Sequence, residues 1–337
     1  MKKLMLIVPV LAGVLWGSAG IFVRTLSAAG FGNCTITFSR FAVAAVMIFI
    51  GIMAVDRSML KIKPKDIWVF IICGIFGMMG LNLCYNKAID GLTLSLAAVL
   101  LSMSPVFVMF MASIILHERV TLKKVGCTAL AVAGCVLVSG ALEAGGADNI
   151  TVLGIICGIA AAFFYAVYSI FSKVAMKQRY NVFTIIFYSL VTSAIVLAPF
   201  VDWRVMGDFV VEAPAGHSLF MLLNSLCTSV LPYVLFTVSL SYVDTSKVSI
   251  LAAGGEPSAA MIFGIIAYSE VPSVLSLCGL VVTIIAIWLL LRPDKPQVGR
   301  QADSGGAQKT PDKPQVNRVN AQENAAELKK DGEKTCC

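Results

Sequence analysis

Charge is scarce in this chain. Of its 337 residues only 13% are Asp, Glu, Lys or Arg, whereas about 25% is usual for a soluble domain. The shortage is sharper than this average, because 15 of the 45 charged residues fall in the last 45 positions. The 30 that remain cannot cover the surface of a water-soluble globule of 292 residues. The scarcity excludes a soluble enzyme, a nucleic-acid-binding protein and a disordered chain, and it predicts an integral membrane protein.

Clusters of chemically reactive residues are also lacking. The two histidines, His117 and His217, stand 100 positions apart, and the ten cysteines form no CxxC pair. No group of His and Cys has the spacing of zinc ligands, and neither an HExxH motif nor a P-loop is present. The sequence therefore predicts no metal site, no cofactor, no direct use of ATP and no enzyme activity.

Apolar residues, by contrast, form long runs. They make up 58% of the chain, and ten stretches are long enough to cross the hydrocarbon layer as helices, which takes about 20 residues each. The stretches cover residues 4–27, 34–54, 66–88, 93–117, 124–142, 151–175, 181–201, 217–241, 246–268 and 273–291. Because the runs are continuous rather than alternating, we expect helices and not strands. The predicted fold class is an all-α integral membrane protein with ten transmembrane helices.

The positions of Lys and Arg predict the orientation in the membrane. If the N-terminus is cytoplasmic and ten helices alternate, the cytoplasmic segments hold 22 of the 26 Lys and Arg residues, the other side holds three, and Arg40 lies inside a span. We therefore expect a multi-pass protein of the cell (plasma or inner) membrane with both termini cytoplasmic. The polar segment 293–337 repeats the phrase Pro-Asp-Lys-Pro-Gln-Val and is predicted to be a disordered cytoplasmic tail.

The chain also repeats itself. Pro105 stands 13 residues before Glu118 in the fourth span, and Pro257 stands 13 residues before Glu270 in the ninth. Further matched positions are 149 and 151 residues apart. Each half then holds five helices, and because five is odd the second half must enter the membrane from the opposite side.

Two halves of opposite orientation form an inverted repeat, which we place at residues 1–142 and 151–292. Secondary transporters use this arrangement, with the substrate bound near the midplane between the repeats. Two similar halves can exchange conformations and so open the site first to one side and then to the other. The alternative is a channel, or a membrane-embedded scaffold without active transport.

Short motifs in both halves carry a family resemblance. They are Leu15-Trp16-Gly17, Ser39-Arg40-Phe41, Ser104-Pro105-Val106-Phe107, His117-Glu118-Arg119, Gly255-Glu256-Pro257 and Ser269-Glu270. In order, spacing and duplication the motifs resemble the drug/metabolite transporter superfamily, specifically its EamA-like members with two five-helix repeats. The resemblance covers about residues 4–292. It implies efflux or exchange of small metabolites, with a central cavity lined mainly by helices 1, 3, 4, 6, 8 and 9.

Glu256 is the only acidic residue deep within a predicted span. An ionised carboxylate in hydrocarbon is costly, so this group must be protonated, paired or in contact with a wet cavity. One interpretation is a titrating group that couples transport to protons or holds a cationic group of the substrate. The other is a carboxyl that bonds backbone atoms freed by Pro257. Pro105 and Pro257 are predicted to act as hinges, with static kinks as the alternative.

Arg40 lies about six residues into the second predicted span. Its long side chain could snorkel to the lipid headgroups, a structural role that we favour. It could instead face the cavity, where it would bind a carboxylate or pair with Glu256. The second half has no arginine at the matching position.

Polar and aromatic residues concentrate in the helices expected to line the cavity. The predicted substrate-binding residues are Trp16, Asn82, Tyr85, Asn86, Ser104, Tyr165, Tyr168, Tyr233 and Glu256. Such a site suits an amino-acid-like or an amphipathic, aromatic solute, moved by secondary-active transport. The expected partners are this solute, the lipid bilayer and, as one candidate coupling ion, protons. The GxxxG spacing of Gly13 and Gly17 leaves a monomer and a homodimer open.

Overall fold

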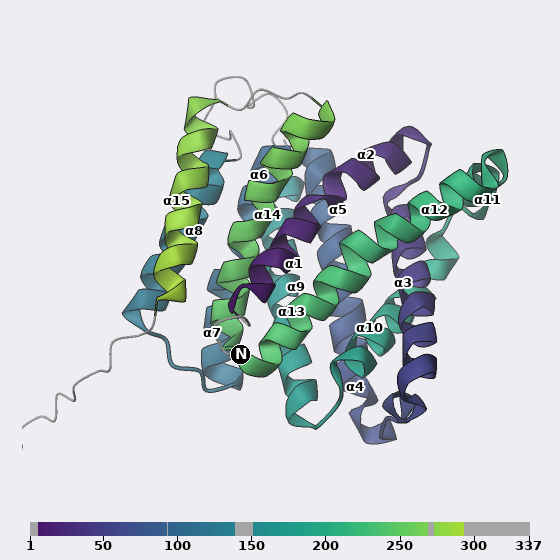
Figure 1. The fold of residues 1–337 in the computed structure, drawn as a ribbon, viewed down its shortest axis with the longest axis horizontal. Coiled ribbons are helices and arrows are strands. Elements are labelled where there is room, and N and C mark those ends of the chain that lie inside the picture. Colours follow the sequence, from purple (N-terminus) through teal and green to yellow (C-terminus); the bar gives the residue numbers. More distant parts are fainter. Residues whose placement is uncertain (1–5, 93, 139–150, 269–272, 293–337) are drawn as a thin grey trace, which may run out of the picture. The chain divides into compact units, whose positions relative to one another are not determined.

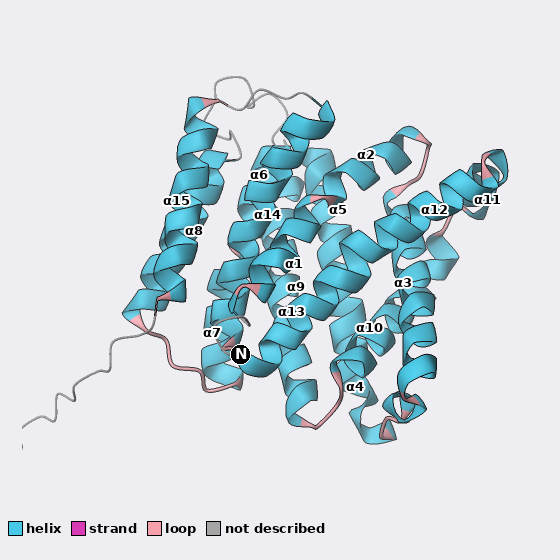
Figure 2. Ribbon diagram, in the orientation of Figure 1, coloured by secondary structure: helices cyan, strands magenta, loops and turns pink. Residues whose placement is uncertain are grey.

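Helices make up all the regular structure of the described residues (Figure 2). The computed structural model describes residues 6–92, 94–138, 151–268 and 273–292. The predicted tail at 293–337 lies outside these residues, and so does Glu270. The fold described below is that of the unit Met1–Pro293.

The helices follow one another as Figure 1 shows. In the first half they are α1 (Val8–Gly17), α2 (Ala19–Ala28), α3 (Asn33–Val55), η2 (Arg57–Leu60), η3 (Pro64–Asp66), α4 (Ile67–Ile71), η4 (Ile72–Gly80), α5 (Leu81–Gly91), α6 (Leu94–Leu101), α7 (Ser104–Ile115) and α8 (Leu122–Val138). In the second half they are α9 (Val152–Lys177), α10 (Val182–Leu197), η5 (Ala198–Phe200), α11 (Trp203–Glu212), α12 (Pro214–Ser225), η6 (Leu226–Val230), α13 (Leu231–Tyr242), α14 (Thr245–Tyr268) and α15 (Val274–Leu291).

Each predicted apolar stretch coincides with one helix or with a run of helices joined end to end. Seven of these segments are long and apolar enough to cross a membrane on their own. They are Val8–Ala28, Asn33–Val55, Pro64–Ala88, Val152–Lys177, Val182–Phe200, Pro214–Tyr242 and Val274–Leu291. The all-helical, multi-pass membrane class is thereby confirmed. The other three predicted stretches correspond to α6–α7, α8 and α14. Helix α14 contains two charged residues, Lys247 and Glu256.

The helices pack in pairs that join the two halves. Helix α1 packs against α14 and α13, while its counterpart α9 packs against α7 and against η4 and α5. Helix α3 packs against its counterpart α10, and α8 against its counterpart α15. Each of these contacts recurs when the halves exchange places, so the interface between the halves involves helices from every part of the unit.

Two π-helical segments were not predicted from the sequence. They are η4 in the third helical segment and η6 in the eighth. The 151-residue offset carries residues 72–80 onto 223–231, which contain η6. Pro232 stands two residues after the end of η6 and lacks the N–H that an α-helix would use there. At η4, the Ser193 hydroxyl donates to the Gly74 carbonyl at 2.9 Å. This hydrogen bond satisfies a backbone group that the wider turn exposes.

The two predicted hinge prolines differ in their surroundings. The fourth segment is interrupted between α6 and α7, directly before Pro105, whereas α14 runs unbroken through position 257. A further break divides the first segment at Ser18, whose hydroxyl donates to the Leu15 carbonyl at 2.7 Å and so competes with the helical backbone pattern. The matched positions therefore do not produce matched kinks.

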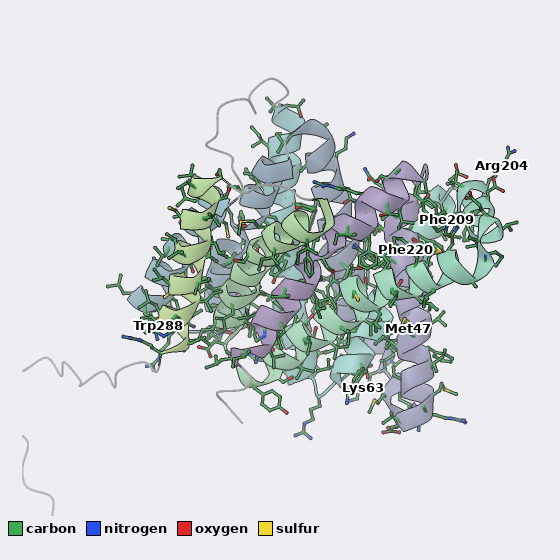
Figure 3. All side chains as sticks on the ribbon, turned by 45° about the horizontal axis from the view of Figure 1, so that its top comes forward. Met47, Lys63, Arg204, Phe209, Phe220 and Trp288 are labelled. Carbon is green, nitrogen blue, oxygen red and sulfur yellow. The ribbon has the colours of Figure 1, made fainter. Side chains whose placement is uncertain are left out.

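Helix α11 is an extra element where the sequence suggested only a connection. Asp202 caps it by accepting from the backbone N–H groups of Arg204 and Val205, both at 3.2 Å. Its Phe209 is buried, with its ring 5.2 Å from that of Phe31, and Figure 3 shows it beside Phe220 of α12. The cluster at this corner fixes α11 and α12 against α2 and α3.

Gly13 of the first helix makes a helix–helix contact within the chain. A Cβ atom added at Gly13 would lie 2.2 Å from the carbonyl oxygen of Ala252, and one added at Gly255 would lie 2.7 Å from that of Val10. Helices α1 and α14 thus cross with their backbones in near contact, which only residues without a side chain allow. Gly13 serves this crossing, so the spacing gives no support to a dimer contact.

We expect Gly13→Ala to destabilise the protein by about 1–3 kcal/mol, because the methyl group must push the two backbones apart. Thermal unfolding of the purified protein in detergent measures the effect. The matched control is Gly20→Ala, since nothing lies within 4 Å of a Cβ added at this helical glycine. Equal melting temperatures for the two variants would contradict the close crossing.

Candidate functional site

Four of the predicted binding residues form one aromatic cluster. Trp16 of α1 lies 6.1 Å from Tyr165 of α9 and 5.3 Å from Tyr233 of α13, measured between ring centroids. Tyr168 of α9 lies 5.2 Å from Tyr233. Phe236 of α13, which the sequence analysis missed, contacts three of these rings, with its own 5.5 Å from that of Trp16. Trp16 and Tyr165, which are 149 residues apart and hold matched positions in the two halves, thus belong to the same cluster.

The hydroxyl groups of this ring cluster differ in their hydrogen bonding. The Tyr168 hydroxyl bonds the Thr237 hydroxyl at 2.8 Å. The Tyr165 hydroxyl is buried and completes no hydrogen bond, and neither does the Ser249 hydroxyl of α14, which it approaches. Buried polar atoms normally have partners, so atoms without one mark a place where a ligand or water can bind.

A polar seam between α3 and α5 lies beside the rings. The Arg40 guanidinium donates through Nη2 to Oδ1 of Asn82, and Nδ2 of Asn82 donates to the Met78 carbonyl at 2.8 Å. One turn further along α5, Nδ2 of Asn86 donates to the Thr37 hydroxyl at 3.4 Å. Both predicted asparagines therefore have partners within the helix bundle.

The snorkelling interpretation of Arg40 is wrong. The side chain is only 8% exposed, because α3 presents it to α5 and α13 rather than to the membrane surface. Its charged group lies 5.4 Å from the ring of the neighbouring Phe41, and its Nε atom has no hydrogen-bond partner. A sequence window could not reveal this, since the direction of a side chain depends on how α3 is rotated against its neighbours.

Glu256 lies on α14 directly beside the crossing with α1. Its carboxylate is close enough to interact electrostatically with Tyr85, Tyr165 and Tyr233. Within the described residues it has no hydrogen-bond or ion-pair partner. The backbone carbonyl that a proline at 257 leaves free belongs to Ala253, and it accepts from the Cys135 thiol at 3.8 Å. The interpretation of Glu256 as a carboxyl that bonds backbone atoms freed by Pro257 therefore has no support, because no such bond is present among the described residues.

Tyr85 and Ser104 belong to helices of the first half. Tyr85 packs against the buried cluster of Ala88, Leu92 and Ala97. Ser104 is buried at the first position of α7, a helix that packs against α9 and α14. Pro105 follows it and is buried too.

The rings contact one another, and two grooves lie away from them, both bordered by α11. A groove of about 400 Å³ runs between α3, α11 and α12 and is lined by Phe38, Trp203 and Met221 among others. The central cavity that the family resemblance implies stays a prediction. Among the described residues, no three His, Cys, Asp or Glu side chains gather closely enough to hold a metal ion.

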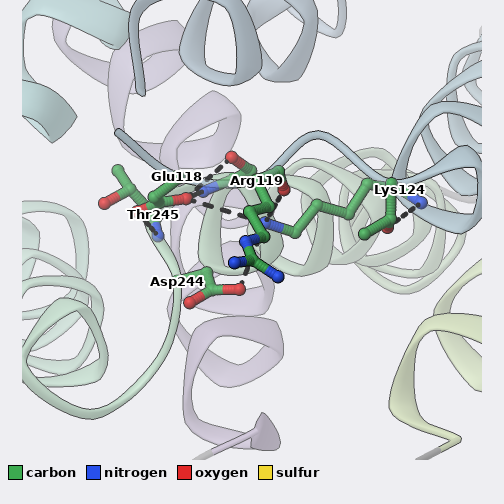
Figure 4. A network of polar contacts seen from close by, with 7 residues as sticks. Glu118, Arg119, Lys124, Asp244 and Thr245 are labelled. Carbon is green, nitrogen blue, oxygen red and sulfur yellow. Dashed lines mark hydrogen bonds and ion pairs between the residues drawn. The ribbon is translucent and has the colours of Figure 1, made fainter. Parts of the chain in front are cut away.

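A second polar network closes one end of the bundle (Figure 4). Glu118 accepts from the backbone N–H of Thr245 at 2.7 Å and from the Ser246 hydroxyl at 2.9 Å, at the beginning of α14. Lys124, which is buried, lies 3.8 Å from the Glu118 carboxylate and 3.1 Å from that of Asp244. The network thus ties the connection after α7 to the first turn of α14.

Local backbone geometry directs Glu118 into this network. His117 adopts a left-handed conformation with φ of 56°, and the N–H of Glu118 returns to the Ala112 carbonyl at 3.1 Å. The carboxylate then meets the free N–H groups at the positive end of α14. The sequence signal was the repeated Pro-to-Glu spacing, which marked Glu118 as part of the repeat but gave it no function. The matching Glu270 lies outside the described residues.

A family model matches both halves of the chain. The EamA-like transporter family matches residues 3–140 and again residues 152–292. A crystal structure with 18% sequence identity superimposes with a TM-score of 0.67, covering 86% of this chain and 96% of its own. At that identity the likeness concerns the fold alone.

Curated relatives match most of the chain at low identity. An uncharacterized transporter of Archaeoglobus fulgidus is 27% identical over 80% of this chain and 90% of its own length. A probable terminal-alkyne amino-acid exporter of Streptantibioticus cattleyicolor is 26% identical, over 84% of this chain and 92% of its own. The pseudopaline exporter of Pseudomonas aeruginosa is 26% identical, over 77% and 86% respectively.

Removal of the Glu118 carboxylate is expected to destabilise the protein. Glu118→Ala leaves two backbone N–H groups and the buried Lys124 without their acceptor, a loss of about 1–3 kcal/mol. Glu118→Gln retains one acceptor and should lose less. Thermal unfolding measures both, with Glu212→Ala as the control, because Glu212 is exposed. A Glu118→Ala melting temperature equal to that of the control would show that the network contributes nothing.

Proposed function

Because the chain belongs to the EamA-like transporter family, we propose that it is a secondary-active carrier that moves a small metabolite across the cell membrane by alternating access. One observation carries the proposal. Rings from both halves meet at a single cluster, with Arg40 of the first half and Glu256 of the second close to it. A change in how the halves pack would alter this cluster directly. A channel or a scaffold has no need of two halves that share one site.

The proposed topology has ten spans, with the repeats 1–142 and 151–292 in opposite orientations and both termini in the cytoplasm. In Figure 1 the connections after α3, α7, α9 and α13 lie at the lower end of the bundle, and those after α2 and α10 at the upper end. Figure 3 shows Lys63 and Arg204 at opposite ends. The matched π-helical segments and the exchange of helix contacts between the halves support the inverted repeat.

The proposed substrate is amino-acid-like, or an amphipathic solute with an aromatic group. The ring cluster offers faces and edges for an apolar group, and Asn82, Asn86, Arg40 and Glu256 offer polar partners. Two relatives, the probable terminal-alkyne amino-acid exporter and the pseudopaline exporter, support efflux of small metabolites. Export or exchange is therefore the direction that we propose.

Alternating access requires the closed ends of the bundle to open in turn. The Glu118 network closes the end that we assign to the cytoplasm, because it holds the beginning of α14 against the connection after α7. The break before Pro105 separates α7 from α6, so α7 can move with this end. Pro105 is the proposed hinge in the first half, and Pro257 in the second.

Glu256 is the proposed coupling group. Its carboxylate has no ion-pair partner among the described residues, and the groups around it are Tyr85 of α5, Cys135 of α8, Tyr165 of α9 and Tyr233 of α13. A carboxylate in such surroundings exchanges a proton for a cationic group of the substrate, which couples the two movements.

The inverted topology predicts that matched connections face opposite sides of the membrane. Exposed Lys61 and Arg204 lie in the connections after the second and the seventh segment. In a background without native cysteines, Arg204→Cys in intact cells should react with a membrane-impermeant maleimide, and Lys61→Cys should react only after permeabilisation. Labelling of both from the same side would refute the inverted repeat.

Reconstituted vesicles test the carrier itself. We expect the purified protein to support saturable uptake of at least one of the twenty radiolabelled amino acids, accelerated by the same solute on the far side. The uptake rate of the wild type should depend on pH, and Glu256→Gln should abolish this dependence while Glu212→Gln preserves it. Uptake that never saturates would identify a channel, and an unchanged pH profile in Glu256→Gln would remove Glu256 from the coupling step.

A further inference from the structure

Arg40 is a buried cation without a counter-ion among the residues that the structure describes. Its side chain is 8% exposed, and its single hydrogen bond, through Nη2, goes to the neutral Oδ1 atom of Asn82. The Nε atom has no partner, and none of the described carboxylates pairs with the guanidinium. Taking an ion out of water without a compensating charge costs several kcal/mol. A protein retains such a group where a ligand completes it.

The surroundings of Arg40 orient the guanidinium without neutralising it. Asn82 is fixed by its own bond from Nδ2 to the Met78 carbonyl, so its oxygen is held toward Arg40. Tyr233 is close enough to interact electrostatically with both Arg40 and Glu256. The same tyrosine belongs to the ring cluster. Arg40 and Glu256 thus each lie near Tyr233 of the ring cluster.

The two halves contribute charges of opposite sign to this region. The 149-residue offset carries Arg40 onto Ser189, whose hydroxyl donates back to the Ile185 carbonyl at 2.7 Å. The 152-residue offset carries Glu256 onto Ser104, which is buried. Each half therefore has an ion where the other half has a serine. The pseudo-symmetric pocket is in this way made dipolar, with one positive group and one negative group.

We propose that Arg40 binds the carboxylate of the transported solute and that the solute is an amino acid whose ammonium group faces Glu256 and whose side chain contacts the ring cluster. A guanidinium matches a carboxylate in geometry, because its N–H groups can donate two parallel hydrogen bonds. The free Nε–H is one such donor. This assignment deepens the proposed carrier function and rests on it.

The first test compares ligands on the unmodified protein. Thermal stabilisation of purified wild type is measured with each of the twenty L-amino acids and with its carboxamide, which keeps the amine and side chain but lacks the carboxylate. We expect at least one amino acid to stabilise the protein, with an apparent Kd at least tenfold lower than that of its amide. Stabilisation by no amino acid, equal stabilisation by acid and amide, or stabilisation by amides alone overturns the proposal.

The second test removes the guanidinium. Arg40→Gln should abolish the discrimination between acid and amide, and Arg40→Lys, which keeps the charge but loses the planar fork, should retain part of it. Arg204→Gln is the control, because Arg204 is exposed at the end of the bundle. Undiminished discrimination in a folded Arg40→Gln overturns the proposal. If Arg40→Gln does not fold, Arg40→Lys decides, since full discrimination in that variant would also overturn it.

Failure of the Arg40 proposal can be distinguished from failure of the proposed carrier function. Saturable uptake of a solute without a carboxylate, unchanged in the Arg40 variants, would leave the transporter standing and remove Arg40 from its site. Carboxylate-dependent binding without any uptake would keep the Arg40 site and remove the carrier. An Arg40→Gln phenotype that Glu256→Gln corrects would show instead that the two side chains pair with each other.

Discussion

The close crossing of α1 and α14 is the contact on which the rest of the arrangement depends. Gly13 and Gly255 let the two backbones approach until one added carbon atom would collide with a carbonyl oxygen. Helix α1 belongs to the first half and α14 to the second, so this crossing locks the halves together. It also places Trp16, one turn from Gly13, against the tyrosines of α9 and α13, and it holds Glu256 beside them. In a membrane such packing stabilises more than hydrophobicity does, because lipid tails are as apolar as the side chains.

Polar groups in the interior follow the same constraint, since none can turn to bulk water. Most find a partner on a neighbouring helix, as Asn86 finds Thr37 and Tyr168 finds Thr237. Among the described residues, the buried side-chain atoms without a partner include Nε of Arg40 and the hydroxyl groups of Tyr165 and Ser249. A protein that only needed to be stable would not leave such atoms unpaired. Tyr165 belongs to the ring cluster, and Ser249 and Arg40 lie near its tyrosines, which is the structural reason to place a ligand there.

Duplication and divergence both shape the molecule. The duplicated features are the helix pairing, the π-helical segments and the aromatic positions at Trp16 and Tyr165. The divergent features are the charges, because Arg40 and Glu256 have serines as their counterparts. In the proposed carrier, similar halves would allow two conformations of comparable stability, and unlike charges would make the proposed site asymmetric. At the end of the bundle, the Glu118 network likewise joins the two halves, because the contact that caps α14 comes from a residue of the first half.

The sequence by itself determined the membrane class, the position of each helical segment and the duplication. Lipid imposes these strongly, because a span must be long, apolar and helical wherever it lies in the fold. It also pointed to Trp16, Tyr165, Tyr168 and Tyr233, since matched positions in two halves are brought to one interface. Only the tertiary structure decided that Arg40 is buried against Asn82, that Gly13 meets α14 and that Glu118 caps a helix more than a hundred residues away. Such facts depend on the rotation and depth of each helix against its neighbours, which hydropathy along the chain does not encode.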